Sequence, residues 1–429
     1  MAVSASEAFL HSLAERTFLK LWSVPNAYRA PGKEISDLII VFGDDIVIFS
    51  DKACEFSTEP DLQTGWDRWR RVAIDGSVRQ LAGALRRLSE DAAAIFVDAK
   101  GRTSLPFPLP PSERRRFHLV AIARPSHDPE ATPLGWRALT CVAEPTGRPF
   151  EVEQLAVGDL PVHVFDGVTM DILLEHLDTA PDFIAYLDGR ARQLAGGGAY
   201  SLEDLDLLAG SIRNWGSGSG LSPEVPPFAS VARGYWPRYV GSDGAIRSAS
   251  LNKRSRTIDR LIEHFHQAYE AGSFLRNKPP EILAHEQALR LIAAESRFAR
   301  RMIVTPLYDI LSEEDQSVPW TATVPSPRDP TIRYLWLIYP DPPEGTDPDE
   351  FARLVDAQLQ HQTLVIAGEF KPDRVIAIAV PNGAASENVV IMRVFDSSRW
   401  SDEDRRQAML LKDERLFGES VRTDHLHIP

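Results

Sequence analysis

Two apolar runs separated by a short turn place the strongest constraint on how this chain folds. Residues 35–42 (ISDLIIVF) and 46–52 (IVIFSDK) are rich in β-branched residues, and Gly43, Asp44 and Asp45 lie between them. Such runs around turn residues predict two antiparallel strands joined as a hairpin. Because the first run is apolar on both faces, we expect it to be a central strand of a sheet.

The elements predicted around this hairpin form a small α/β unit. Apolar residues recur at helical spacing over residues 6–22, before the hairpin, and over about 66–90, after it. Strands are expected at 94–98 and 117–123, with a proline-rich stretch between them. The predicted order therefore begins with helix, strand, strand, helix and strand.

The rest of the chain predicts two further regions, which gives three domains at 1–125, 126–330 and 331–429. The middle region is mostly helical with Pro- and Gly-rich loops, and the C-terminal region alternates strands and helices. A strand is expected near 161–165, with helices at 168–177, 180–195, 258–271 and 279–302. The C-terminal strands are expected at 333–339, 363–368, 374–380 and 388–395, and the helices at 349–361 and 401–412.

Composition excludes several classes of protein. No stretch reaches the roughly 18 apolar residues of a membrane span, and the first residues do not resemble a signal peptide, so we expect a cytoplasmic protein with no membrane partner. Its two cysteines, Cys54 and Cys141, are expected to be reduced, and they lack metal-ligand spacing. The net charge of −14 argues against coating nucleic acid nonspecifically, but it allows a local basic groove.

Ionisable side chains mark the ends of the predicted hairpin. Asp37 begins the first strand, Asp51 and Lys52 end the second, and Glu15 lies on the preceding helix. This order and spacing resembles the PD-(D/E)xK nuclease superfamily, and the segment EISDLIIVFGDDIVIFSDK resembles its nuclease-related-domain branch. More loosely, the whole chain resembles large bacterial proteins that carry this nuclease core at their N-terminus.

The resemblance implies a multidomain α/β (α+β) chain with a restriction-endonuclease-like core at residues 1–125, a mostly helical middle region and a small C-terminal α/β domain. It also implies a metal-dependent nuclease that cleaves the phosphodiesters of DNA or RNA. In this family Mg²⁺ or Mn²⁺, held by carboxylates, activates water and polarises the phosphoryl group. Here Asp37, Asp51 and Glu15 would bind the metal, and Lys52 would assist the nucleophile.

The sequence departs from the family pattern at one position. The second acid should stand two residues before Lys52, where the chain has Ser50. A two-residue turn would place Asp37 opposite Ser50 and on the face of Lys52, whereas a three-residue turn would place it opposite Asp51. We favour Asp51 as a displaced acid, because a metal site with a single strand carboxylate would be weak.

The helix predicted at about 66–90 supplies supporting groups. Gln80 shares a helical strip with small residues and is expected to point toward the sheet. The resemblance implies that a Gln at this place lies near the scissile phosphate. Arg70, Arg71 and Arg79 make the helix locally basic and are candidates for phosphate contacts. The structural alternatives are a hydrogen-bonded amide at the edge of the core and an ordinary solvated helix face.

Three hypotheses follow from these observations, and the third of them is an unrelated α/β scaffold protein. The first is an endonuclease with a nucleic-acid substrate, acting in antiphage defence by analogy, with the rest of the chain sensing a protein trigger or restraining the nuclease, and with a homodimer as one expected state. The second is a catalytically degenerate nuclease fold used as a binding or sensor module. Ser50 is the main argument for the second.

Overall fold

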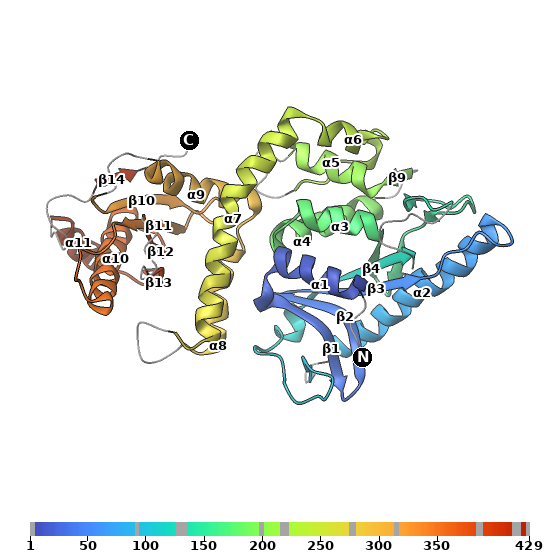
Figure 1. Cartoon of the computed structure of the whole chain (residues 1–429), viewed down its shortest axis with the longest axis horizontal. Coiled ribbons are helices and arrows are strands. Elements are labelled where there is room, and N and C mark those ends of the chain that lie inside the picture. The colour runs from blue at the N-terminus through green and yellow to red at the C-terminus, as the bar shows by residue number, and fades with distance from the viewer. Residues whose placement is uncertain are drawn as a thin grey trace. The chain divides into compact units, whose positions relative to one another are not determined.

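The computed structural model describes residues 5–90, 94–125, 135–196, 201–214, 223–273, 280–312, 317–382, 389–413 and 422–425 (Figure 1). Its contacts divide the chain into two compact units. Unit 1 comprises Met1–Ser248 and Glu281–Ser296, and unit 2 comprises Ala249–Pro280 and Arg297–Pro429. Both units combine helices with a sheet, which confirms the expected α/β class.

Unit 1 is built on a six-stranded sheet in the order β1-β2-β3-β4-β8-β7. The first three strands form an antiparallel meander, and β4 and β8 run parallel to β3. The expected hairpin is thus β2 and β3, and β2 is a central strand as predicted. The strands are β1 (Ser23–Ala30), β2 (Lys33–Phe42), β3 (Asp45–Cys54), β4 (Arg116–Pro125), β8 (Leu160–Asp166) and β7 (Leu155–Val157).

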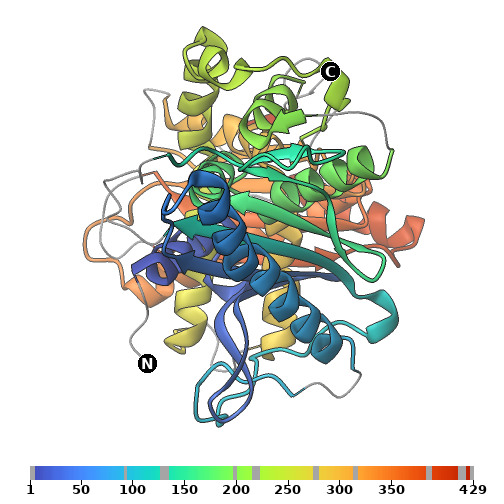
Figure 2. The same cartoon turned by 90° about the vertical axis from the view of Figure 1, so that its right-hand side faces the viewer.

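Helices cover both faces of this sheet. The helices α1 (Ala5–Phe18), α3 (Gly167–His176) and α4 (Ala180–Ala195) pack on one face, where Phe18, Phe49 and Phe183 form the centre of the core. The long helix α2 (Leu62–Leu88) crosses the other face, as Figure 2 shows. Burial of these apolar faces is what holds the three layers together, at about 25 cal/mol per Å² of apolar surface.

The helix α2 follows from local signals that the sequence predicted. Asp61 caps its start by accepting a hydrogen bond from the Thr64 N–H at 2.9 Å, which satisfies one of the free donors of the first turn. Trp66, Trp69 and Leu81 belong to its buried stripe, as their helical spacing indicated. The expected helix over about 66–90 is confirmed, with its start four residues earlier.

The strand β1 was not expected, because Pro25 interrupts its sequence. It is an edge strand, and an edge strand tolerates a residue without an N–H donor. The left-handed backbone of Asn26, at φ 47°, and the breaks in register around Tyr28 absorb the irregularity. The strand expected at 94–98 is reduced to two isolated bridges of Phe96, one to Ser104 and one to Tyr28, with which it exchanges two backbone hydrogen bonds.

Several smaller elements complete unit 1. A second, three-stranded sheet has the order β6-β5-β9. In the sequence, β5 and β6 follow β4, and β9 comes only after β7, β8, α3 and α4. Its strands are β5 (Thr140–Val142), β6 (Glu151–Val152) and β9 (Ser201–Glu203). The remaining helices are α5 (Asp204–Asn214), α6 (Tyr235–Val240), the start of α7 (Asp243–Glu270) and α8 (Ile282–Ala293).

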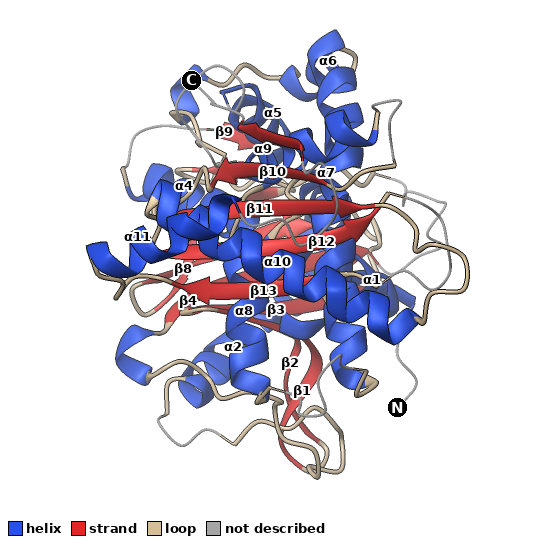
Figure 3. Cartoon of the chain, turned by 90° about the vertical axis from the view of Figure 1, so that its left-hand side faces the viewer, coloured by secondary structure: helices blue, strands red, loops and turns tan. Residues whose placement is uncertain are grey.

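Unit 2 contains a five-stranded sheet in the order β13-β12-β11-β10-β14. Figure 3 shows α10 lying across one face of this sheet, where Val355, Leu359 and Ile366 pack on strand residues such as Leu335 and Ala377. The strands are β10 (Trp320–Pro325), β11 (Ile332–Tyr339), β12 (Arg374–Pro381), β13 (Ile391–Asp396) and β14 (Arg422–His425). The helices are α9 (Arg297–Leu311), α10 (Pro348–Phe370) and α11 (Asp402–Leu410).

The structure corrects three organisational expectations. The boundary expected after residue 125 falls inside unit 1, because β8 from the expected middle region pairs with β4. The boundary expected after residue 330 falls inside unit 2, because β10 pairs with β11. The strand expected at 363–368 is part of the helix α10. Within the described residues, no helix combines the length and the hydropathy needed to cross a membrane.

Candidate functional site

The turn between β2 and β3 decides which side chains of the hairpin share a face. Phe42 pairs with Asp45, so the turn contains two residues, and its first residue, Gly43, has the positive φ (64°) that such turns need. Leu38 pairs with Phe49, and continuing this register places Asp37 opposite Ser50. Of the two registers that the sequence left open, the structure has the two-residue turn.

Asp37, Ser50 and Gln80 meet on the face of the sheet that α2 covers. Ser50 Oγ donates to Gln80 Oε1 at 3.0 Å, and Gln80 Nε2 donates to Asp37 Oδ1 at 3.4 Å. The backbone N–H of Asp51 donates to the other Asp37 oxygen at 2.6 Å. Gln80 therefore points toward the sheet as expected, and both oxygens of the Asp37 carboxylate accept hydrogen bonds.

Lys52 projects to the same face, because it stands two residues beyond Ser50 on the strand. Its stem lies against α2 at Gly76, where a Cβ would stand 3.3 Å from Lys52 Cε. Lys52 is half-buried, and its ammonium forms no ion pair with any residue that the structure describes. Asp37 and Gln80 are thus in contact, and Lys52 shares their face of the sheet.

Asp51 points to the opposite face and belongs to a different cluster. Arg124 Nε lies 3.1 Å and 3.2 Å from the two Asp51 oxygens, and the other guanidinium nitrogens bind Asp171 at 2.9 Å and 3.1 Å. The Asp51 side chain is only 1% exposed. This corrects the expectation that Asp51 acts as a displaced acid beside Asp37, since its carboxylate is committed to Arg124.

Burial dominates the electrostatics of this second cluster. Loss of solvation raises the pKa of Asp51 from 3.8 to about 6, although the nearby Arg124 guanidinium lowers it in part. Burial also raises the pKa of Asp171. Asp51 and Asp171 thus share one guanidinium, and each is harder to ionise than a carboxylate in water.

The expected metal ligands do not assemble into a cation site. Glu15 is exposed on α1, and Asp37 and Asp51 present their carboxylates to opposite faces of β2 and β3. Within the part of the chain that the structure describes, no three His, Cys, Asp or Glu side chains are grouped as metal ligands. The residues present therefore do not fit Mg²⁺ or Mn²⁺ held by Glu15, Asp37 and Asp51.

The arginines expected to contact phosphates divide into two kinds. Arg70 forms an ion pair with Glu153 at 2.5 Å, which ties α2 to the segment after β6. Arg71 and Arg79 are exposed, and neither forms an ion pair with a described residue. Arg70 thus has a structural role instead of the expected contact, while the other two remain available to a ligand.

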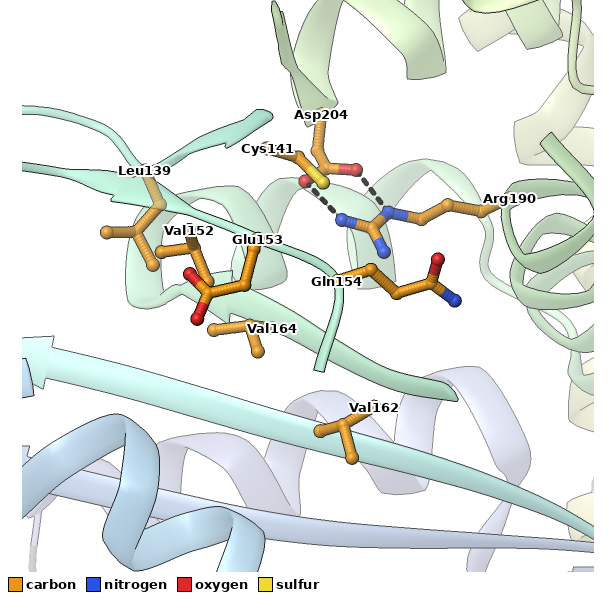
Figure 4. A pocket seen from close by; sticks show the side chains of 9 residues that line it. All are labelled: Leu139, Cys141, Val152, Glu153, Gln154, Val162, Val164, Arg190 and Asp204. Atoms are coloured by element: carbon orange, nitrogen blue, oxygen red, sulfur yellow. Dashed lines mark hydrogen bonds and ion pairs between the residues drawn. The ribbon is translucent and has the colours of Figure 1, made fainter. Parts of the chain in front are cut away.

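A small buried cavity in unit 1 is lined by residues that the sequence did not single out (Figure 4). Arg190 and Asp204 face each other there, with nitrogen–oxygen distances of 2.6 Å and 3.1 Å, and Cys141 and Glu153 lie beside them. Its volume is about 10 Å³, room for about one water molecule. The cavity is thus too small for a substrate, and Arg190 with Asp204 is a buried structural ion pair.

The sequence contained signals for only part of this arrangement. Gln80, Asp37 and Lys52 were chosen from the resemblance to the nuclease pattern, and strand alternation and helical spacing, which are local, predicted the faces to which they point. Arg124 directly follows the predicted strand 117–123, but its role was not predicted. The reason is that its partner Asp171 is distant in sequence. Cys54 and Cys141 are not joined in a disulfide, so no such bond adds a constraint.

Comparisons with known proteins add no identification. No protein-family model, no curated protein and no solved structure matches this chain. The assignment therefore rests on the geometry of the site and on physical argument.

We expect Asp51→Asn to reduce the pH dependence of the unfolding free energy between pH 4 and 7. Because the folded-state pKa of Asp51 is about 6 and its reference value is 3.8, the folded state holds a proton that the unfolded chain releases. This stabilisation is complete below the lower pKa and is lost as the pH rises through about 6, a loss of about 3 kcal/mol. Urea unfolding at several pH values measures it.

The control is Asp67→Asn, which removes an exposed carboxylate from α2. It should leave the slope of stability against pH as in the wild type. Asp171 contributes a slope of the same sign, so the Asp51 variant should reduce the slope without abolishing it. An unchanged slope in Asp51→Asn would refute this account of the buried carboxylate.

Proposed function

We propose that unit 1 is a nuclease-like module that binds DNA or RNA without assembling the metal site of a cleaving enzyme. The observation that carries this proposal is that Ser50, and not an acid, faces Asp37 near the end of β3. Ser50 stands where the second acid of a nuclease would be, and Asp51 is held by Arg124 on the other face. The observed order, helix, three strands, helix, strand, contains the order that accompanied the resemblance and adds β1 before the hairpin, and it supports the same class of fold.

The charges at the site favour binding of an anionic backbone. Lys52 lies without an ionic partner among the described residues, on the same face of the sheet as Asp37, whose carboxylate already accepts two hydrogen bonds. A second carboxylate at position 50 would repel a phosphate unless a cation were bound, and the neutral Ser50 removes that repulsion. Phosphate contacts of this kind supply affinity without reading sequence.

A second candidate function is metal-dependent cleavage of DNA or RNA. It is favoured by one observation, that Asp37, Gln80 and Lys52 share a face as the nuclease pattern requires. Magnesium in phosphoryl-transfer sites is often held by only one or two carboxylates together with substrate phosphates. Under this alternative a trigger would activate the enzyme, and antiphage defence would be its setting.

One experiment separates the two candidates. The full-length protein is titrated into labelled duplex DNA, single-stranded DNA and RNA, and the same mixtures with Mg²⁺ or Mn²⁺ are analysed for cleavage. We expect binding that weakens with salt, and intact nucleic acid. We expect Lys52→Ala to weaken binding roughly fivefold, which corresponds to about 1 kcal/mol.

The variants are chosen so that each result has one meaning. Asp37→Asn keeps an acceptor for the Asp51 N–H, and Lys100→Ala removes an exposed lysine elsewhere as the control for Lys52→Ala. Metal-dependent cleavage that is lost in both Asp37→Asn and Lys52→Ala would establish the second candidate. Failure of the wild type to bind any nucleic acid would end the binding proposal.

A further inference from the structure

The outer face of α2 carries a row of unpaired cations. On the same helix Arg70 and Arg87 are paired, with Glu153 and Glu90 respectively. Four other arginines are exposed, and none of them forms an ion pair with a described residue although the chain has 61 Asp and Glu. These four residues, named here the arginine stripe, are Arg68, Arg71, Arg79 and Arg86.

Helical geometry places the stripe on one side of α2. At roughly 100° per residue, Arg68, Arg79 and Arg86 lie within about 20° of one another around the helix axis, and Arg71 lies about 60° away. At 1.5 Å per residue the stripe is about 27 Å long. Among the described residues of α2, two carboxylates lie beside the stripe, the half-buried Asp75 and the exposed Asp67, which stands one turn before Arg71. The four arginines outnumber them, so the helix surface has a local positive charge.

The stripe approaches the candidate site at Gly76. A Cβ there would lie 3.3 Å from Lys52 Cε and 3.8 Å from Arg79 Nη2, so these two cationic side chains flank the same bare stretch of helix. Two like charges held side by side without a carboxylate between them are stabilised by a bound anion. Further along the helix, Gly83 has open space beside it, which allows a ligand to come close to the backbone.

We propose that the arginine stripe and Lys52 form one surface that follows the phosphate backbone of a nucleic acid. This inference deepens the proposed function and rests on it. In a chain of net charge −14, four exposed guanidiniums without an ionic partner among the described residues form a local positive surface that a polyanion can neutralise. A backbone of regularly spaced phosphates matches an array about 27 Å long better than a single small anion does.

Salt dependence of binding tests the proposal directly. Each phosphate neutralised on duplex DNA contributes about −0.9 to the slope of log affinity against log salt, or about −0.7 on single strands. We expect the combined variant R68Q/R71Q/R79Q/R86Q to reduce the magnitude of this slope by about 3 to 4 on a duplex. At low salt its affinity should fall at least tenfold. Fluorescence anisotropy of labelled duplex and single-stranded oligonucleotides measures both quantities.

A charge-matched control separates the stripe from net charge. Four exposed arginines elsewhere are changed to Gln together, and this variant also loses four positive charges. It should bind within about threefold of the wild type, since diffuse charge is screened at the ionic strengths used. The control residues are Arg102, Arg148, Arg328 and Arg353.

Each outcome decides between the inference and the proposed function. Wild-type binding that the stripe variant retains in full would overturn the stripe and leave the proposed function standing, whereas a wild type that binds no nucleic acid would overturn both. Binding that depends on the stripe but occurs only with anionic phospholipid vesicles would overturn the inference that the stripe binds nucleic acid. If the fourfold variant does not fold, the double variant R68Q/R79Q replaces it. For the double variant we expect half the change in the slope of log affinity against log salt.

Discussion

Arg124→Met is expected to destabilise unit 1 by about 3–5 kcal/mol. Methionine keeps the length of the apolar stem, so the main loss is the guanidinium between Asp51 and Asp171. That leaves two buried carboxylates without their shared cation, and burial already raises the pKa of both. Urea denaturation at pH 7 measures the change in unfolding free energy.

The matched control is Arg114→Met, which removes an ion pair of similar geometry at the surface. Arg114 lies 2.7 Å from Asp44, but the two side chains are 60% and 34% exposed, so the loss of stability should be much smaller than in Arg124→Met. Adding Asp51→Asn to the Arg124 variant should restore part of the stability, because one uncompensated charge is then gone. Equal effects of the Arg124 and Arg114 variants would contradict the argument.

Gly65→Ala is expected to destabilise the protein by about 3 kcal/mol or more. Overpacking commonly costs about 1–3 kcal/mol, and this clash should reach the upper end of that range because it is with backbone atoms. A Cβ at Gly65 would lie 1.8 Å from the Ser57 carbonyl oxygen and 3.4 Å from the Thr58 Cα. Both are backbone atoms, so no side-chain rotation can relieve the clash. The loop before α2 and the first turns of the helix would have to move apart. Thermal and urea unfolding report the loss.

Gly83→Ala is the matched control on the same helix. Nothing lies within 4 Å of the position of its added Cβ, so the substitution should be neutral or stabilise the helix by up to about 1 kcal/mol. The same chemical change is thus expected to have opposite signs at two positions of α2. A Gly65→Ala variant as stable as Gly83→Ala would show that the loop does not need this close approach.

Most elements of the sheet in unit 1 were predictable because their signals are local. The hairpin of β2 and β3, the helix α2 and the strand β8 each follow from apolar runs, turn residues or helical spacing. The run at 363–368 was misread as a strand because a short apolar run does not distinguish a buried strand from a buried helix. There the preceding turns of α10 continue through it, and packing on the sheet decides for the helix.

The candidate site was only partly predictable because it depends on long-range partners. Asp37, Lys52 and Gln80 were chosen by the resemblance to the nuclease pattern, and the structure places them on one face of the sheet, with Gln80 in contact with Asp37. The role of Asp51 could not be read in the same way. Its partner Arg124 is 73 residues away, and Arg124 reaches Asp171 from a strand that must first pair with β3.

The sequence by itself determined that a buried hairpin carries Asp37 near one strand end and Lys52 near the other, with a basic helix to follow. Only the tertiary structure decided which side chains share a face. A single residue more or less in the turn after Phe42 would exchange Ser50 and Asp51, because successive side chains on a strand point in opposite directions. The length of the turn, together with the ion pair that Arg124 forms with Asp51 on the other face, decides the directions of Ser50 and Asp51, which the local sequence pattern leaves open.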